Sequence, residues 1–155
     1  MSFRITGLPL ERFTPLFDLD PAELARRGIV EMTVDEPGAY PCRVTLEDAE
    51  VGEKVLLLNH AHLEGTSPYA SSGPIFVRRV ATAAASVIDR VPDHQSRRLL
   101  SVRAYDERDW IVDAEVTPGT ELATLIERFF ADNEVRYLHV HNARRGCYAC
   151  RVDRA

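Results

Sequence analysis

The sequence predicts a single α+β domain, residues 1–155, in which a mainly antiparallel sheet carries two or three helices packed on it. Three observations favour this class. Eight short segments are rich in β-branched, leucine or aromatic residues, short turn-like connections separate several of them, and one long amphipathic helix follows the sixth. No repeat, low-complexity tract or long linker divides the chain, and its length suits one hydrophobic core.

The composition is that of a soluble globular protein, with 45% hydrophobic and 28% charged residues. A net charge of -5 argues against a general nucleic-acid binder, and apolar runs such as 55–58 are too short to span a bilayer. The first residues lack the pattern of a secretory signal, and three cysteines are an odd number. We therefore expect a cytoplasmic protein with free thiols and with no nucleic-acid or membrane partner.

The helices are predicted from capping signals and from periodicity. A weak helical turn covers 11–17, and Asp20 is a helix N-cap followed by Pro21, with Glu23 three residues after the cap and Gly28 as a stop. The strongest helix lies within Thr117–Asp132, where apolar residues recur on one face. This face comprises Leu122, Leu125, Ile126, Phe129 and Phe130.

The predicted strands are short segments between these helices and after them. They are 29–34, 43–46, 55–59, 75–78, 99–105, 111–116, 135–141 and 148–153. The connections 106–109 and 142–146 are short enough for hairpins, which indicates antiparallel pairing. Segment 80–86 is predicted as a loop, and Arg103 is expected to meet Asp113 or Glu115 across a hairpin.

The last hairpin concentrates chemistry-bearing side chains. Tyr137, His139 and His141 share one face of its first strand by the period of two, and a register that pairs His141 with Cys147 would place a base beside a thiol. Cys147, Ala149 and Arg151 are expected to share that face of the return strand. Small Ala149 would leave space, and Asn142, Arg144 and Arg145 would offer donors at the rim.

Cys147 and Cys150 form a C-x-x-C motif, which is typical of a redox pair or half of a zinc site. No helix follows the motif, and residues three apart in a strand point to opposite faces. Cys150 is therefore expected in the core with Tyr148 and Val152, while a functional thiol and a small core residue remain alternatives for Cys147.

Two H-x-H pairs, His60 with His62 and His139 with His141, suit a transition metal, and Cys42, Cys147 or Glu64 could complete a ligand set. No spacing matches a known signature, so we expect no native metal site and no cofactor. The turn-rich loop 67–74, which contains Ser72 and precedes Arg78, could cradle an anion or be an ordinary surface connection.

Several sequence blocks resemble the domain-of-unknown-function family 1203, almost from end to end. The blocks are 3–9, 40–44, 48–53, 55–59, 67–69, 139–141, 146–149 and 151–152. The most specific is the stretch from His139-Val140-His141 to Gly146-Cys147-Tyr148-Ala149. The resemblance implies a small bacterial protein with no assigned activity, and it supplies no catalytic residues.

The leading hypothesis is a domain that binds a small anionic molecule, and whether it also catalyses a reaction stays open. We assign Cys147 and His141 as the catalytic candidates. The ligand-binding candidates are His139, Asn142, Arg144, Ser72, Arg78 and Cys42. The alternatives are a non-catalytic interaction or stress-related protein, in which a homodimer is compatible with the sequence, and a transition-metal-binding protein.

Overall fold

The protein contains two antiparallel sheets, described by a computed structural model of residues 1–155. The larger sheet has the order β5-β1-β9-β8-β6-β7, and the smaller has the order β2-β3-β4. Their strands are β1 (Phe3–Thr6), β2 (Val30–Thr33), β3 (Lys54–Leu63), β4 (Ser71–Arg78), β5 (Ser86–Ile88), β6 (Leu99–Tyr105), β7 (Ile111–Pro118), β8 (Tyr137–Asn142) and β9 (Tyr148–Arg154). The α+β class is confirmed, with strands dominating.

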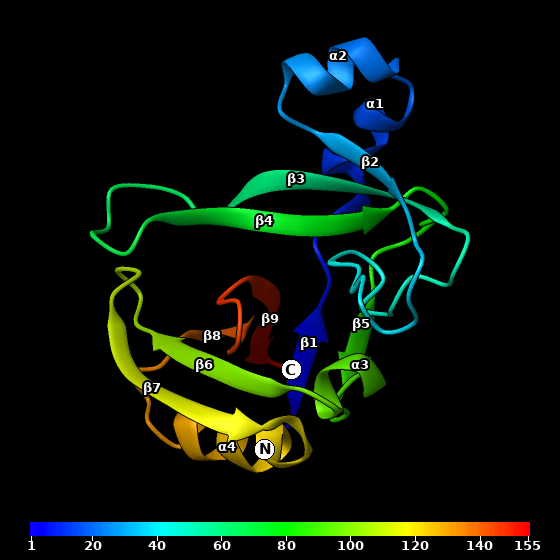
Figure 1. Ribbon diagram of the computed structural model, residues 1–155. Helices are drawn as coiled ribbons and strands as arrows, with labels where there is room; N and C mark the ends of the chain where they lie inside the picture. The colour runs from blue at the N-terminus through cyan, green and yellow to red at the C-terminus, as the bar shows by residue number, and fades with distance from the viewer.

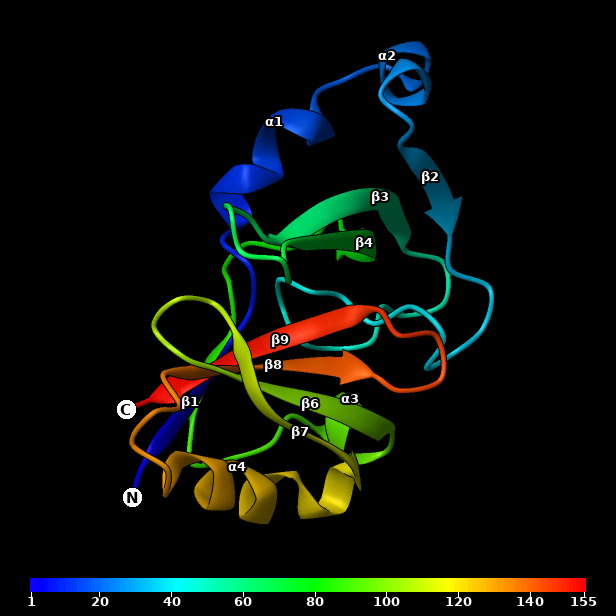
Figure 2. The same ribbon diagram turned by 90° about the vertical axis from the view of Figure 1, so that its left-hand side faces the viewer.

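The helices do not all pack on one sheet, which corrects the expected arrangement. They are α1 (Thr14–Phe17), α2 (Pro21–Arg26), α3 (Asp93–Ser96) and α4 (Leu122–Phe130), with 3-10 turns at Leu10–Arg12 and Gly119–Glu121. Figure 1 and Figure 2 show α4 beneath the six-stranded sheet, the three-stranded sheet stacked above it, and α1 and α2 at the top. The smaller sheet covers the face of the larger sheet that is opposite α4.

The predicted apolar helix face is confirmed in α4. All five of its large apolar side chains are buried, and they join Phe3, Ile5 and Leu138 in the principal core. Thr117 and Pro118 continue β7, and the 3-10 turn at Gly119–Glu121 leads into the helix, which begins at Leu122. Glycine is required at position 119, since a Cβ there would lie 1.9 Å from the Gln95 carbonyl oxygen.

A second core joins the two sheets. It contains Phe13 and Leu24 from the N-terminal helical segment, Leu56 and Ile75 from the smaller sheet, and Tyr148 from β9. The Asp20 cap is confirmed by a 2.8 Å hydrogen bond from the Glu23 amide. Helix α2 is therefore a short capped helix whose Leu24 is anchored in this core.

Segment 43–46 is not a strand, contrary to prediction. Leu46 adopts a positive φ of 53°, and only isolated bridges tie this region to strands. The buried Arg43 side chain holds the turn instead, because its Nε donates to the Tyr148 carbonyl at 2.7 Å and its Nη1 donates to the Pro41 carbonyl at 2.6 Å. Hydrogen bonds from the Arg43 guanidinium to two backbone carbonyls therefore hold this segment in place, instead of backbone pairing between strands.

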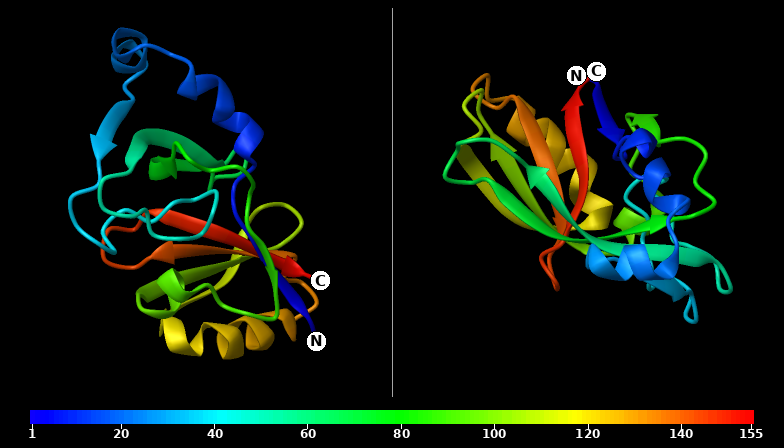
Figure 3. Two further views of the ribbon diagram at one scale, coloured as in Figure 1. Left: turned by 90° about the vertical axis from the view of Figure 1, so that its right-hand side faces the viewer. Right: turned by 90° about the horizontal axis from the view of Figure 1, so that it is seen from above.

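Three short elements were not predicted, namely β1, β5 and α3. Strand β1 lies inside the larger sheet, where it pairs with both β5 and β9, and Phe3 opposes Arg154. Figure 3 shows the two termini side by side as a result. Elements of three or four residues carry too little periodicity to be recognised in a single sequence.

Replacing Phe129 by alanine is expected to lower the free energy of unfolding by roughly 3–5 kcal/mol, because a large buried side chain leaves a cavity. Phe129 is 2% exposed in the core beneath the sheet. Urea denaturation measures the loss, and Glu127→Ala on the exposed side of α4 is the matched control. An unchanged transition midpoint for Phe129→Ala would contradict this packing.

Candidate functional site

Three histidines meet between the two sheets. Strand β8 presents Tyr137, His139 and His141 on one face, as predicted, and β3 brings His62 against them. The ring centroids of His62 and His141 are 5.0 Å apart, those of His62 and His139 are 5.9 Å apart, and those of His139 and His141 are 6.4 Å apart. We call His62, His139 and His141 the intersheet histidine cluster.

Tyrosine rings enclose this cluster. Tyr148 stacks on His62 with centroids 5.2 Å apart and planes 8° apart, and it contacts His139 and His141 edge-on. Tyr105 contacts His139 from β6, and its ring stacks on Tyr137 at 5.1 Å. His139 and His141 are consequently only 2% and 1% exposed.

The tautomer of His141 follows from its hydrogen bond. Its Nδ1 lies 2.9 Å from the Gly146 carbonyl oxygen, which can only accept, so Nδ1 carries the proton. In the neutral ring, Nε2 is therefore a free acceptor, and it is buried without a partner. The buried Nδ1 of His139 and both nitrogens of His62 also lack partners.

All three rings are neutral near pH 7. Burial is the largest cause, and it lowers the pKa of His139 to about 3 and the pKa values of His62 and His141 to about 4. The positive charge of Arg103 lowers all three pKa values further. The cluster therefore offers uncharged imidazoles rather than imidazolium ions.

Arg103 was expected to form an ion pair within its hairpin, and that expectation is wrong. It lies opposite Ala114 in β7 and beside His139 in β8. Glu115 pairs with Arg128 at 3.5 Å instead, and the Asp113 carboxylate accepts from the Ala114 amide at 2.8 Å. Arg103 is left half-buried beside the histidine cluster without a salt bridge.

The expected register of the last hairpin is also wrong. His141 pairs with Tyr148 rather than with Cys147, because a β-bulge shifts the ladder after Val140. The bulge turns Tyr148 toward the histidines, whereas Cys150 lies with Val152 in the core on the α4 side, as expected for these two residues. The catalytic roles of Cys147 and His141 stay predictions that this register does not support.

The remaining predicted residues do not converge on one place. Asn142 ends β8 with a buried Oδ1 that lacks a partner, and Arg144 is exposed in the hairpin turn. Ser72 is exposed on β4. Cys42 and Arg78 do meet, since the Arg78 amide donates to the Cys42 sulfur at 3.4 Å.

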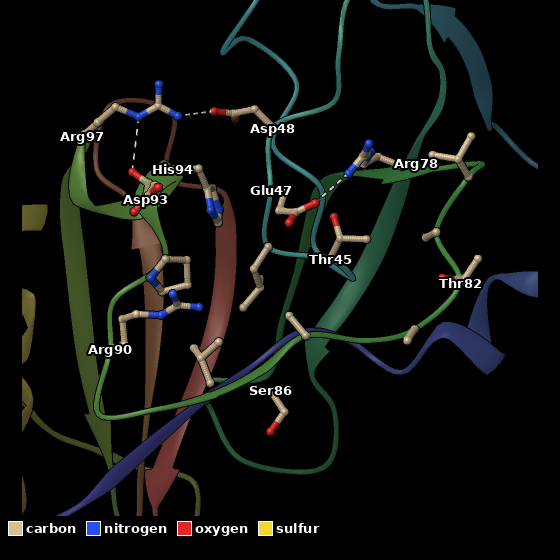
Figure 4. Close-up of a pocket in the computed structure, with 17 residues that line it drawn as sticks. Thr45, Glu47, Asp48, Arg78, Thr82, Ser86, Arg90, Asp93, His94 and Arg97 are labelled. Carbon is tan, nitrogen blue, oxygen red and sulfur yellow. Dashed lines mark hydrogen bonds and ion pairs between the residues drawn. The ribbon is translucent and has the colours of Figure 1, made fainter.

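Arg78 lines a separate groove with a volume of about 820 Å³ (Figure 4). Its walls come from segments 45–48, 78–87 and 90–97, and none of the other predicted site residues lines it. Sequence reasoning missed this groove, together with its buried His94, because three segments that are distant in the chain build it. Sequence reasoning also missed Arg103 as a site residue. Only its pairing with His139 on the neighbouring strand could have indicated this role.

The structure does not arrange any three histidine, cysteine, aspartate or glutamate side chains to hold a metal ion. The histidine cluster also lies beside the positive charge of Arg103, which disfavours a cation. No helix is long and apolar enough to cross a membrane.

A family model described as "Protein of unknown function (DUF1203)" matches residues 39–154. This span includes Arg103, the whole histidine cluster and the groove. No curated protein and no solved structure matches the chain significantly.

The free energy of unfolding is expected to fall as the pH falls from about 6.5 toward about 4. Histidines in the unfolded chain bind protons in this window, whereas His139 and His141 in the folded state do not, so acid favours unfolding. Each should contribute about 2 kcal/mol of loss between pH 7 and pH 5. Urea denaturation at the two pH values measures the difference, which should shrink in His139→Gln; an identical pH dependence in that variant would contradict burial of a neutral ring.

Alkylation of the native protein is expected to label Cys147 first. Cys42 and Cys150 are fully buried, and burial raises the pKa of Cys150 to about 12, whereas Cys147 is partly exposed in the turn. Mass spectrometry of timed samples locates the label, with denatured protein as the control in which all three cysteines react. Labelling of Cys150 as fast as Cys147 would contradict the observed burial of Cys150.

Proposed function

Since the chain belongs to the DUF1203 family of proteins of unknown function, we propose from its geometry that it binds a small anionic molecule between the two sheets, at Arg103 and the intersheet histidine cluster. One observation carries the proposal. Arg103 makes no salt bridge, although it lies beside imidazoles whose buried nitrogens have no partner.

Charge compensation supports an anion. A half-buried guanidinium without a carboxylate loses hydration that nothing in the protein replaces. A carboxylate or phosphate group would fit the planar fork of N–H donors on Arg103. Tyr105, whose ring contacts His139, lies on the same strand as Arg103 and borders this position.

The histidines add proton chemistry to this site. The free Nε2 of His141 can accept a proton from the ligand or from solvent, since its Nδ1–H is committed to Gly146. A bound anion would favour the imidazolium form and raise the lowered histidine pKa values. Binding should therefore be accompanied by proton uptake and become tighter as the pH falls. His141 is also the residue that would act as a base if the ligand is transformed.

Titration calorimetry with inorganic phosphate, sulfate, acetate and citrate tests this proposal at about pH 6 and pH 8. We expect at least one of these anions to bind, more tightly at the lower pH, with an apparent enthalpy that depends on the buffer because protons are taken up. Arg103→Gln should weaken binding roughly tenfold or more, because a hydrogen-bonded charge is lost.

Arg128→Gln is the matched control, because its exposed side chain lies on α4, on the other side of the larger sheet. Circular dichroism confirms that both variants fold. The proposal fails if none of the four anions binds, or if Arg103→Gln binds them as tightly as Arg128→Gln does.

A further inference from the structure

The groove beside α3 has the size of a ligand site, and its argument is independent of the histidine cluster. Its volume of about 820 Å³ lies within the range of small-molecule pockets. Figure 4 shows Asp93, His94 and Arg90 on one side, facing Thr45 and Glu47 on the other. Charged and hydroxyl side chains therefore face a shared space from segments far apart in the chain.

Most of the charges in the groove neutralise one another. Arg78 binds Glu53 through Nε at 2.9 Å and through Nη2 at 3.0 Å, and it reaches Glu47 at 3.0 Å. Arg97 binds Asp48 at 2.7 Å. These ion pairs neutralise the charges of Arg78 and Arg97, so neither residue needs a ligand to balance its charge.

Arg90 and Asp93 are the exceptions. Both side chains line the groove, and neither makes a salt bridge or a side-chain hydrogen bond. They lie three residues apart, Arg90 in the turn after β5 and Asp93 as the first residue of α3. The groove is therefore lined by one unpaired positive side chain and one unpaired negative side chain.

Buried polar atoms in the same walls also lack partners. His94 is 4% exposed, and its buried Nδ1 has no hydrogen-bond partner. Burial lowers the pKa of His94 to about 4, so its ring is neutral, and in the tautomer with the proton on Nε2 its Nδ1 is an acceptor without a donor. Across the groove, the buried Thr45 hydroxyl is likewise unpartnered.

We propose that this groove binds a zwitterionic small molecule of the α-amino acid class. The ligand carboxylate would bind Arg90, and its ammonium group would face Asp93 and donate a hydrogen bond to Nδ1 of His94. A simple anion would satisfy Arg90 but would meet Asp93 as a like charge, and a simple cation would face the reverse problem. A molecule that carries both charges satisfies both residues.

A thermal-shift screen with the proteinogenic amino acids, followed by titration calorimetry of those that stabilise the protein, tests the proposal. We expect at least one to bind. Its N-acetyl derivative lacks the ammonium charge, and its carboxamide lacks the carboxylate, so each should bind roughly tenfold more weakly or worse. The proposal is overturned if no amino acid binds, or if both derivatives bind as well as the parent.

Arg90→Gln and Asp93→Asn should each weaken binding by a similar factor, because each removes one charge. Both side chains are exposed and unpaired, so these variants should fold normally. Arg128→Gln and Arg103→Gln should bind as the unmodified protein does, and the latter separates this site from the intersheet cluster. Undiminished binding by both groove variants would overturn the assignment.

Discussion

The buried guanidinium of Arg43 is the interaction on which the arrangement of the two sheets depends. This side chain is 3% exposed and spans from the Pro41 carbonyl to the Tyr148 carbonyl. Burial lowers its pKa to about 10, so it still carries its charge near pH 7. Because Tyr148 is held at the β-bulge by this contact, its ring lies against His62 of the opposite sheet. If β9 moved away from the turn, the Arg43 charge would stay buried without one of its two carbonyl acceptors, which costs free energy. This cost fixes the position of β9 relative to the turn.

The parts of the fold that could be predicted are those set by local periodicity. The α4 face, the Asp20 cap and the shared face of Tyr137, His139 and His141 each depend on residues within one element. The bulge in β9 could not be predicted, because an extra residue in a ladder reverses the faces that follow without leaving a pattern in the chain. The turn at 43–46 was mistaken for a strand because Val44 and Leu46 are buried in the two cores, and periodicity does not distinguish such burial from strand pairing.

Only the part of the candidate site that lies within one strand could be predicted from the sequence. His139 and His141 were recognised on their strand, but the approach of His62 depends on how one sheet stacks on another. Arg103 shows most directly what the sequence could not predict. Its expected partners, Asp113 and Glu115, lie on β7, which is the neighbouring strand on one side only. Its important neighbour is His139 on the other side. The groove around His94 and Arg90 combines three distant segments, so no local sequence signal could indicate it.

The carboxylates of β7 have a consequence for how the molecule behaves among its own copies. This strand is an outer edge of the larger sheet and exposes Val112 and Val116, features that invite another strand to add on. Asp113 and Glu115 each accept a hydrogen bond from the amide of the following residue, at 2.8 and 3.1 Å. These amides are thereby withheld from an incoming chain, and the two negative charges repel a second β7. The exposed edge of this sheet is therefore a poor template for the addition of a second β7 strand.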